Sequence, residues 1–442
     1  MSLLAPSVSA VVVAVLAGSG AARAATSGSF DILTMNVAGL PAILQSNDVP
    51  GDKATNAGTI GSDFAKYGYD VINVQEDFNY HAYIYATDNH TYRTATSGGA
   101  AIGSGLNTLA NFDWIDFTRI GWDQCSDASG SDCLTPKGFT MMRTKVDSGV
   151  YVDMYNIHAD AGTETGDETA RNSNLQQVAD YIDTWSTGNA VIVFGDTNSR
   201  YTRTADNIGI FASQNGLTDS WLRLERGGVV PTVESLCDNP STTNDCETVD
   251  KVFYRGNSIV SMDATYFNYE SSKFVQADGD ILSDHNPISV VFAWTLSSSL
   301  RQSDFWGGPH GTWFSDLPTL NSHSKPKASI LTFRGGSRLD SVGLTLTDGT
   351  TFVHGGTGGT QAQLTLGASE YWTSAILCQG QKSGQTRNFY IKATTSSGNT
   401  LAAGTSTSDC ATLSAPAGWQ IVGFVGQDGD EMDQLAFVFA PQ

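Results

Sequence analysis

The sequence predicts a layered α/β sandwich followed by a separate all-β domain, on the basis of three observations. First, 442 residues are more than one ordinary core requires, so two folded units are expected. Second, only 16% of the residues are charged while 46 are glycine, a balance typical of β-rich chains. Third, strand-like and helix-like runs alternate from Phe30 to about Leu296, whereas short alternating strands prevail after Arg301.

Residues 1–25 have the features of an export signal. The apolar run from Val8 to Ala17 is too short to span a bilayer, and Ala22-Arg23-Ala24 provides a small-x-small cleavage site. No later segment is long and apolar enough for a membrane helix. We therefore expect a secreted, extracellular protein without a membrane anchor.

The cysteines agree with export. The six lie along the chain as Cys125 and Cys133, Cys237 and Cys246, and Cys378 and Cys410. Three local disulfides are the simplest framework, although six cysteines allow other connectivities. Metal binding is the competing interpretation, but neither close pair has CxxC spacing or an intervening histidine, which favours disulfides.

The first domain, residues 26–296, is predicted to alternate strands with a long helix. The expected strands are Asp31–Asn36, Val71–Gln75, Tyr151–Ile157, Ala190–Gly195, Lys251–Arg255 and Ile288–Trp294. Between the third and fourth, Leu175, Val178, Ile182 and Trp185 recur at helical spacing within Glu168–Trp185. The succession of strand, helix and strand indicates a layered α/β sandwich.

The second domain, residues 304–442, is predicted to contain strands almost alone. A small polar linker, residues 297–303, precedes it. The domain is rich in Gly, Thr and Ser, and Leu339–Leu346 and Trp419–Val425 alternate as strands do.

Polar motifs stand where strands of the first domain begin or end. Asn36 ends the first strand, Glu76 follows the second, and Asp196 and Asn198 follow Gly195 at the end of a later strand. Ser283-Asp284-His285 precedes the last strand. Each motif alone is more often a turn than a site, but α/β folds gather their active sites at strand ends.

Together and in this order, the motifs resemble the endonuclease/exonuclease/phosphatase superfamily, which includes deoxyribonuclease I and neutral sphingomyelinases. The resemblance runs from about Phe30 to Trp294 and implies a four-layer, deoxyribonuclease I-like α/β sandwich. The residues that carry it are Asn36, Glu76, His158, Asp196, Asn198, Asp250, Asp284 and His285.

The resemblance implies a metal-dependent phosphoric ester hydrolase. Asn36, Glu76 and Asp284 would hold Mg²⁺ or Mn²⁺, since hard cations prefer carboxylate and amide oxygens. The remaining roles concern proton transfer and phosphate binding. His285 would be the general base, Asp250 would orient it, Asp196 would orient the nucleophile, and Asn198 and His158 would bind the phosphate.

Charge narrows the substrate class. The chain carries 24 Lys and Arg against 45 Asp and Glu, a net charge of −21, which repels polyanions and anionic membranes. Within the superfamily, this acidic, exported chain is most similar to sphingomyelinase-like phosphodiesterases, which implies a lipid head group or related small phosphoester. A secreted nuclease with a local basic groove remains an alternative.

The second domain resembles jacalin-related lectins, which implies a β-prism of three small sheets. The resemblance is carried by residues 305–316, by the loop at 353–359 and by Gly429-Asp430-Glu431-Met432-Asp433, which matches the sugar-binding G-x-x-x-D loop. Asp433 would accept from sugar hydroxyls, with Gly308 and the backbone of Asp430 and Glu431 nearby. Two acids stand where an aromatic residue is common, so a purely structural prism is the alternative.

The complete prediction is a secreted Mg²⁺-dependent phosphodiesterase whose lectin domain tethers it to cell-surface or extracellular glycans. Such tethering raises the effective concentration of a surface substrate. The alternative is a secreted lectin whose first domain is catalytically silent. The presence of Glu76, Asp196, Asn198 and His285 favours the enzyme.

Overall fold

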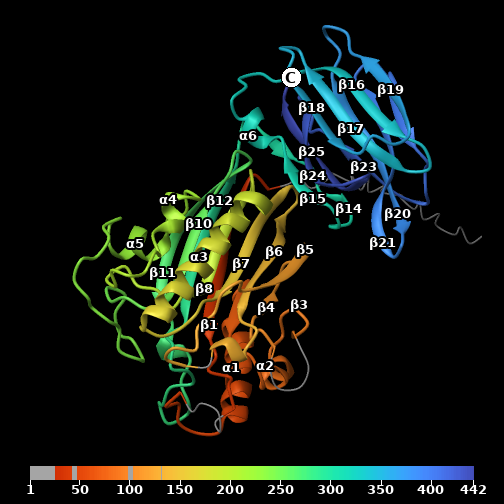
Figure 1. The fold of residues 1–442 in the computed structure, drawn as a ribbon. Helices are drawn as coiled ribbons and strands as arrows, with labels where there is room; N and C mark the ends of the chain where they lie inside the picture. The colour runs from red at the N-terminus through yellow and green to blue at the C-terminus, as the bar shows by residue number, and fades with distance from the viewer. Residues whose placement is uncertain (1–24, 42–46, 98–102, 131) are drawn as a thin grey trace, which may run out of the picture.

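The computed structural model describes residues 25–442 apart from 42–46, 98–102 and 131, and these form two domains (Figure 1). The N-terminal domain combines strands with helices, and the C-terminal domain, at the upper right of the view, has strands and a short helix. The predicted export signal lies almost entirely outside the described residues. Within the described ranges, no helix is long and apolar enough to cross a membrane.

Two six-stranded sheets form the centre of the N-terminal domain. The first contains, in order, β11 (Val260–Tyr269), β12 (Ile288–Leu296), β1 (Ser27–Asn36), β2 (Val71–Gln75), β4 (Asn107–Ala110) and β3 (Tyr92–Arg93). The second contains β5 (Trp114–Gly121), β6 (Gly138–Asp147), β7 (Val150–His158), β8 (Ala190–Asp196), β10 (Asp250–Arg255) and β9 (Thr218–Asp219). Their inner faces share one core, to which Ile32, Val152 and Ile192 contribute.

Helices cover the outer face of each sheet and complete four layers. α1 (Lys53–Tyr67) and α2 (His81–Thr87) pack on the first sheet, and α3 (Thr165–Trp185) packs on the second. The shorter helices are η1 (Asp132–Leu134), α4 (Ile210–Ser213), α5 (Ser220–Glu225) and η2 (Ser271–Lys273). The arrangement confirms the predicted four-layer α/β sandwich.

The strand directions place the candidate site far from the second domain. β1 is parallel to β2 and antiparallel to β12, and β12 leads directly into the C-terminal domain. The carboxyl ends of β1 and β2 therefore point away from that domain, toward the lower end in Figure 1. At about 3.4 Å per residue, a strand as long as β1 separates the two ends by about 30 Å.

The C-terminal domain is a prism of three antiparallel sheets around one core, which confirms the predicted all-β fold. One sheet contains β13 (Arg301–Gln302), β25 (Met432–Pro441), β24 (Trp419–Asp428) and β15 (Thr312–Ser315), with β14 (Trp306–Gly307) paired to β25. The second contains β18 (Thr351–Gly355), β17 (Leu339–Leu346), β16 (Ala328–Gly335) and β19 (Thr360–Thr365). The third contains β22 (Thr400–Gly404), β21 (Gln385–Thr395), β20 (Trp372–Lys382) and β23 (Asp409–Ser414), and α6 (Leu317–Leu320) follows β15.

The six cysteines form the three local disulfides that the sequence predicts. They join Cys125 to Cys133, Cys237 to Cys246, and Cys378 to Cys410. The first two close loops of the N-terminal domain, and the third links neighbouring strands β20 and β23. Because each bridge lies within one domain, other contacts must hold the two domains together.

One carboxylate joins the start of the second domain to the first. Asp304 accepts hydrogen bonds from Lys145 Nζ at 2.6 Å, from the Gly149 backbone nitrogen at 3.0 Å and from the Tyr151 hydroxyl at 3.0 Å. In the predicted linker, β13 pairs with β25, so this stretch is partly built into the prism. The connection between the domains is therefore short and hydrogen-bonded.

A buried ion pair lies beneath the same boundary. The Arg143 guanidinium donates to Asp153 through Nε at 2.8 Å and Nη2 at 3.0 Å. The Cζ atom of the same guanidinium lies 3.6 Å from the centre of the ring of Trp313, a residue of the second domain. Trp313 in turn donates to the Thr187 carbonyl at 3.0 Å. Charge, aromatic stacking and hydrogen bonding therefore act together at this boundary.

We expect Asp153→Ala to lower the free energy of unfolding by about 3–5 kcal/mol, because it leaves the buried Arg143 charge unpaired. The loss is increased by the Ser186 hydroxyl, which donates to Asp153 at 2.6 Å. Chemical unfolding followed by fluorescence measures the change. Arg223→Ala is the matched control, since its pair with Asp263 is half-exposed and contributes no more than about 1 kcal/mol. Equal effects of the two substitutions would contradict the role assigned to Asp153.

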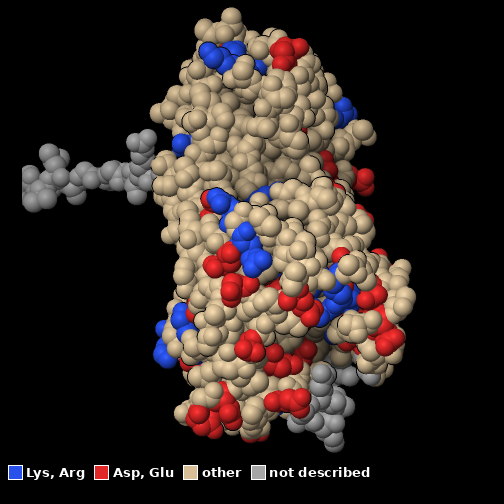
Figure 2. Space-filling view, turned by 90° about the vertical axis from the view of Figure 1, so that its left-hand side faces the viewer, with Lys and Arg blue, Asp and Glu red and all other residues tan. Residues whose placement is uncertain are grey.

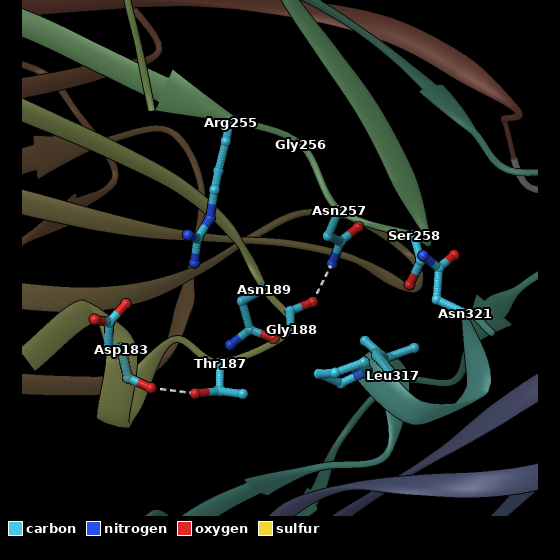
Figure 3. A pocket seen from close by; sticks show the side chains of 11 residues that line it. Asp183, Thr187, Gly188, Asn189, Arg255, Gly256, Asn257, Ser258, Leu317 and Asn321 are labelled. Carbon is cyan, nitrogen blue, oxygen red and sulfur yellow. Dashed lines mark hydrogen bonds between the residues drawn. The ribbon is translucent and has the colours of Figure 1, made fainter. Parts of the chain in front are cut away.

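A cavity of about 330 Å³ also lies at the domain boundary (Figure 3). It is bordered by Asp183 and Arg255 of the first domain and by Leu317 of the second. None of the predicted site residues line it. Several polar groups at its wall are hydrogen-bonded within the protein, as when Asn257 donates to the Gly188 carbonyl at 2.9 Å. We interpret this cavity as a packing gap between the two domains rather than a binding site.

Candidate active site

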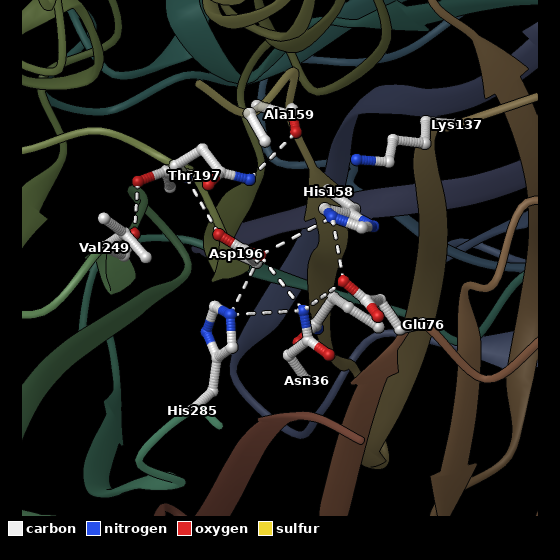
Figure 4. Close-up of polar contacts among 12 residues, drawn as sticks. Asn36, Glu76, Lys137, His158, Ala159, Asp196, Thr197, Val249 and His285 are labelled. Carbon is white, nitrogen blue, oxygen red and sulfur yellow. Dashed lines mark hydrogen bonds and ion pairs between the residues drawn. The ribbon is translucent and has the colours of Figure 1, made fainter. Parts of the chain in front are cut away.

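Strand register places the predicted residues in two facing rows. In the second sheet, His158 on β7 and Asp250 on β10 are both paired in register with Asp196 on β8. In the first sheet, Asn36 on β1 is aligned with the last residue of β2, and Glu76 follows that residue directly. Because both rows lie at the same end of the sandwich, the Asn36, Glu76, His158 and Asp196 side chains meet there (Figure 4).

Asn36 connects the two rows. Its amide nitrogen donates to Glu76 Oε1 at 3.1 Å and to Asp196 Oδ2 at 3.2 Å. His285 Nε2 lies 3.5 Å from the same nitrogen. The Asn36 amide nitrogen therefore contacts one carboxylate from each sheet and the imidazole of the loop before β12.

Two of the site residues have a left-handed backbone that is unusual for their type. Glu76 has φ of 56° and Asn198 has φ of 49°. The turn at Glu76 also requires a glycine opposite, since a Cβ on Gly39 would lie 2.2 Å from the Glu76 carbonyl oxygen. Such backbone strain is concentrated at functional sites, where it fixes the direction of a side chain.

His285 is held by Asp250. The distance from His285 Nδ1 to Asp250 Oδ2 is 2.8 Å, so Nε2 is left facing the cavity. Burial opposes a charge on His285, but Asp250 and Asp196 outweigh it and raise the pKa of the imidazole well above its usual range. Burial also raises the pKa of Asp196, to about 6.

His158 has the opposite electrostatic balance. It is buried beside Asp196, with Nε2 3.5 Å from Asp196 Oδ2 and 4.0 Å from Glu76 Oε1. Burial, reinforced by Lys137 and His285, lowers the pKa of His158 well below its usual range. His158 is therefore a neutral imidazole that can donate one hydrogen bond without carrying charge.

Asn198 and Asp284 lie at the same site but have other partners. The Asn198 side chain donates to the Ala159 carbonyl at 3.1 Å, and its backbone nitrogen donates to Asp196 Oδ1 at 2.9 Å. The exposed Asp284 accepts from Asn47 Nδ2 at 2.9 Å. The structure thus brings Asn36, Glu76 and Asp196 into direct contact, while Asp284 lies at the rim.

Two cavities meet at this end of the domain. One, of about 210 Å³, is lined by residues that include Glu76, His158, Asp196 and Asn198. The other, of about 280 Å³, is lined by residues that include Asp250 and Leu236. Asp284 and His285 line both cavities, so the predicted base stands between them.

Lys137 is a site residue that the sequence analysis missed. Its side chain is buried at the wall of the smaller cavity, and Nζ donates to Asp132 Oδ1 at 2.6 Å. Asp132 lies within the loop that the Cys125–Cys133 disulfide closes, directly before Cys133. No sequence motif includes Lys137. The one feature of the sequence that could have indicated it is its position shortly after Cys133, the second cysteine of the short disulfide loop.

The donor set suits a hard divalent cation. Glu76 Oε2 and Asp250 Oδ1 are buried without a hydrogen-bond partner, which is costly unless a cation or water meets them. The carboxylates at the two cavities also outnumber the cations. Among the described residues, the Asp196, Asp250 and His285 ligand atoms lie within 4.8 Å of one another, but His285 already bonds Asp250. Glu76 therefore fits a metal better than this trio, whereas Asn36 Oδ1 already accepts from the Ala38 backbone nitrogen at 3.0 Å.

The predicted sugar loop of the prism is closed by ion pairs. Glu431 and Asp433 are both buried, and Arg387 pairs with each of them. Burial disfavours the Glu431 carboxylate, but Lys382 and Arg338 outweigh it and lower its pKa. Asp430 is exposed, and the Gly308 backbone nitrogen donates to the Asp433 carbonyl at 3.0 Å. Asp433 Oδ2 is buried without a partner. The sugar site remains a prediction.

Residues 53–291, more than half of the chain, match the model of endonuclease/exonuclease/phosphatase family 2. The chain belongs to this family. The family residues span the segment from α1 to β12 and so include most of the strand ends described above. Residues 303–438 match the jacalin-like lectin domain, in agreement with the observed prism.

Curated relatives of the family domain carry the name sphingomyelinase. The sphingomyelinase of Mycobacterium bovis is 38% identical over 279 residues, which cover 62% of this chain and 54% of that protein. A sphingomyelinase of Mycobacterium tuberculosis gives the same values. This chain therefore spans about half the length of the curated relatives it matches.

Solved structures resemble each domain. Sphingomyelinase C from Streptomyces griseocarneus is 17% identical, with a TM-score of 0.42, and the match covers 60% of this chain and 99% of that one. Malaysian banana lectin is 22% identical, with a TM-score of 0.28, and the match covers 32% of this chain and 98% of that one.

Proposed function

We propose that this member of the endonuclease/exonuclease/phosphatase family is a secreted, metal-dependent phosphodiesterase that hydrolyses a phospholipid head-group ester, as a sphingomyelinase does. The observation that carries the proposal is the meeting of Asn36, Glu76, Asp196 and the His285–Asp250 pair in one contact shell. The sphingomyelinase name of the 38% identical relatives supports the substrate class.

Proton transfer is assigned to His285. Asp250 holds Nδ1, so Nε2 can accept the proton of a water that attacks the phosphorus once a bound cation offsets the carboxylates that raise the pKa of the imidazole. Asp196 lies 3.9 Å from Nε2 and can orient that water through its carboxylate. Asp196 ends β8, whereas His285 lies on the loop before β12 and is held there by its contact with Asp250 of β10.

Phosphate binding is assigned to the donors around the smaller cavity. The neutral His158, the Asn198 amide and the Lys137 ammonium line its wall and can donate to non-bridging oxygens. Glu76 and Asn36 would hold Mg²⁺ or Mn²⁺, which neutralises the phosphate and the developing charge of the leaving group. Asp284, at the rim, can complete the ligand set.

Secretion and glycan targeting form part of the same proposal. The N-terminal export pattern and the three disulfides support an extracellular location. The jacalin-like domain supports a glycan partner, and the buried Asp433 would be its carboxylate contact once Arg387 moves aside. Binding to an array of immobilised hexoses tests the glycan partner.

We expect the purified protein to hydrolyse bis(p-nitrophenyl) phosphate with Mg²⁺, and EDTA to lower the rate by about 100-fold or more. Excess Mg²⁺ should restore the rate. Hydrolysis that resists EDTA would contradict metal dependence, and absence of turnover on every phosphoester would favour the silent lectin. Release of phosphocholine from sphingomyelin, compared with nicking of plasmid DNA, then separates the lipid substrate from the nuclease alternative.

A further inference from the structure

Exposed aliphatic side chains are concentrated on two loops of the described chain. Val229, Val230, Val233 and Leu236 lie within eight residues and have exposed fractions between 49% and 77%. Leu134, on the loop beside the Cys125–Cys133 disulfide, is 70% exposed. We call these five side chains the apolar rim. Clusters of this kind on a soluble domain mark a surface that meets another apolar phase.

Each part of the apolar rim adjoins one of the two cavities. Leu236 lines the larger cavity together with Asp250 and His285. Leu134 lies between Asp132 and Thr135, which line the smaller cavity. Since His285 lines both cavities, each part of the rim lies beside a cavity that contains the predicted base.

The longer loop is anchored at both ends. The Gly228 nitrogen donates to the Leu222 carbonyl at 2.7 Å, so the loop leaves α5 in a fixed direction. At its other end, Leu236 pairs with Glu247 in an isolated parallel β-bridge, next to the Cys237–Cys246 disulfide. The backbone is therefore fixed on both sides of the exposed side chains.

The loop that carries Leu134 is also anchored. The disulfide closes it immediately before Leu134, and the Asp132 carboxylate bonds both Lys137 Nζ and the Ala161 nitrogen, the latter at 2.7 Å. Both parts of the apolar rim are thus preformed and need little ordering when a partner arrives.

Charge distinguishes between possible partners. The chain has a net charge of −21, and on the lower, N-terminal domain Figure 2 shows more carboxylates than cations. Near the rim, Lys137 pairs with Asp132, Arg200 pairs with Glu234 at 2.9 Å, and Arg226 donates to the Asp245 carbonyl. Anionic bilayers and nucleic acids would be repelled, whereas a zwitterionic head-group layer would not.

We propose that the apolar rim docks the protein on a zwitterionic phospholipid bilayer, with the two cavities facing the head groups. Exposed aliphatic side chains enter the boundary between head groups and acyl chains. This inference rests on the proposed function, because it adds the surface through which the same site reaches a lipid ester. The prism, at the far end of the sandwich, is not part of this contact.

The test is binding of the full chain to phosphatidylcholine vesicles, measured by flotation in EDTA so that no hydrolysis occurs. We expect the triple variant Leu134→Ser, Val229→Ser and Val233→Ser to bind about 10-fold more weakly or worse, as three buried aliphatic groups are lost. Leu236 is left intact because it lines the cavity. Val353→Ser, which removes an exposed valine of the prism, is the matched control and should bind normally.

A second measurement separates docking from catalysis. With Mg²⁺ present, the triple variant should hydrolyse soluble bis(p-nitrophenyl) phosphate within about 2-fold of the parent rate, while its rate on vesicles falls with its binding. Unchanged vesicle binding, or binding that needs anionic lipid, would overturn the inference. So would a parent dimer that the triple variant dissociates, since the rim would then contact a second copy. Normal docking without any hydrolysis would refute the proposed function alone.

Discussion

Replacing Glu76 with glutamine is expected to lower kcat/KM for Mg²⁺-dependent diester hydrolysis by about 1,000-fold or more. Glutamine keeps the size of the side chain and an oxygen for Asn36, but it removes the charge that would hold the cation. The loss should be large because Glu76 Oε2 is buried without a partner, and the strained backbone aims it at the cavity. Steady-state kinetics with increasing Mg²⁺ provides the measurement.

The Glu76 prediction has an independent readout in metal binding. The parent protein should show an Mg²⁺-dependent rise in melting temperature that Glu76→Gln lacks. Glu225→Gln, on α5 and outside both cavities, is the matched control and should retain activity and the thermal shift. A variant that hydrolyses diesters normally would rule out Glu76 as the centre of the metal site.

The second large effect is expected at His285. His285→Ala should lower kcat by about 100- to 10,000-fold, because the base that receives the proton of the attacking water is removed. Asp250→Asn alone should cause a smaller loss, since Nδ1 keeps an acceptor. The double variant should fall no further than His285→Ala, because Asp250 acts through His285.

Single-turnover rates of the three His285 and Asp250 variants provide this test. His323→Ala, which removes a histidine of the prism bonded to the Thr319 carbonyl, is the control for loss of an imidazole. If the two losses multiply, Asp250 has a function of its own and the orienting role is wrong.

The sequence located the strand ends at which the candidate site residues meet, because its signal there is local. Asn36, Asp196 and His285 each adjoin a strand that is apolar enough to be recognised, and parallel strands end at a common edge. Val71–Gln75 and Leu339–Leu346 have the predicted bounds, and α3 begins three residues earlier than expected, at Thr165. Local patterns thus located the strands from which the site is built.

Features that depend on distant contacts were missed. α1 contains two glycines, which weaken its helical signal, yet Gly61 is needed because a Cβ there would lie 2.3 Å from the Ile84 carbonyl oxygen of α2. Lys137 and Asp132 enter the site only through the path of a disulfide-closed loop. Likewise, nothing near Asp433 in the sequence indicates that Arg387, 46 residues away, pairs with it.

The contact between the domains has a practical consequence for dissecting the protein. Ending the chain at residue 296 would remove Asp304, the partner of Lys145 and Tyr151, and would strip Trp313 from the Arg143 guanidinium. Ile259, which belongs to the prism core although it lies in the first domain, would be uncovered as well. A shortened catalytic half is therefore a destabilised protein rather than a neutral control, and point substitutions in the full chain are the proper way to separate the contributions of the two halves.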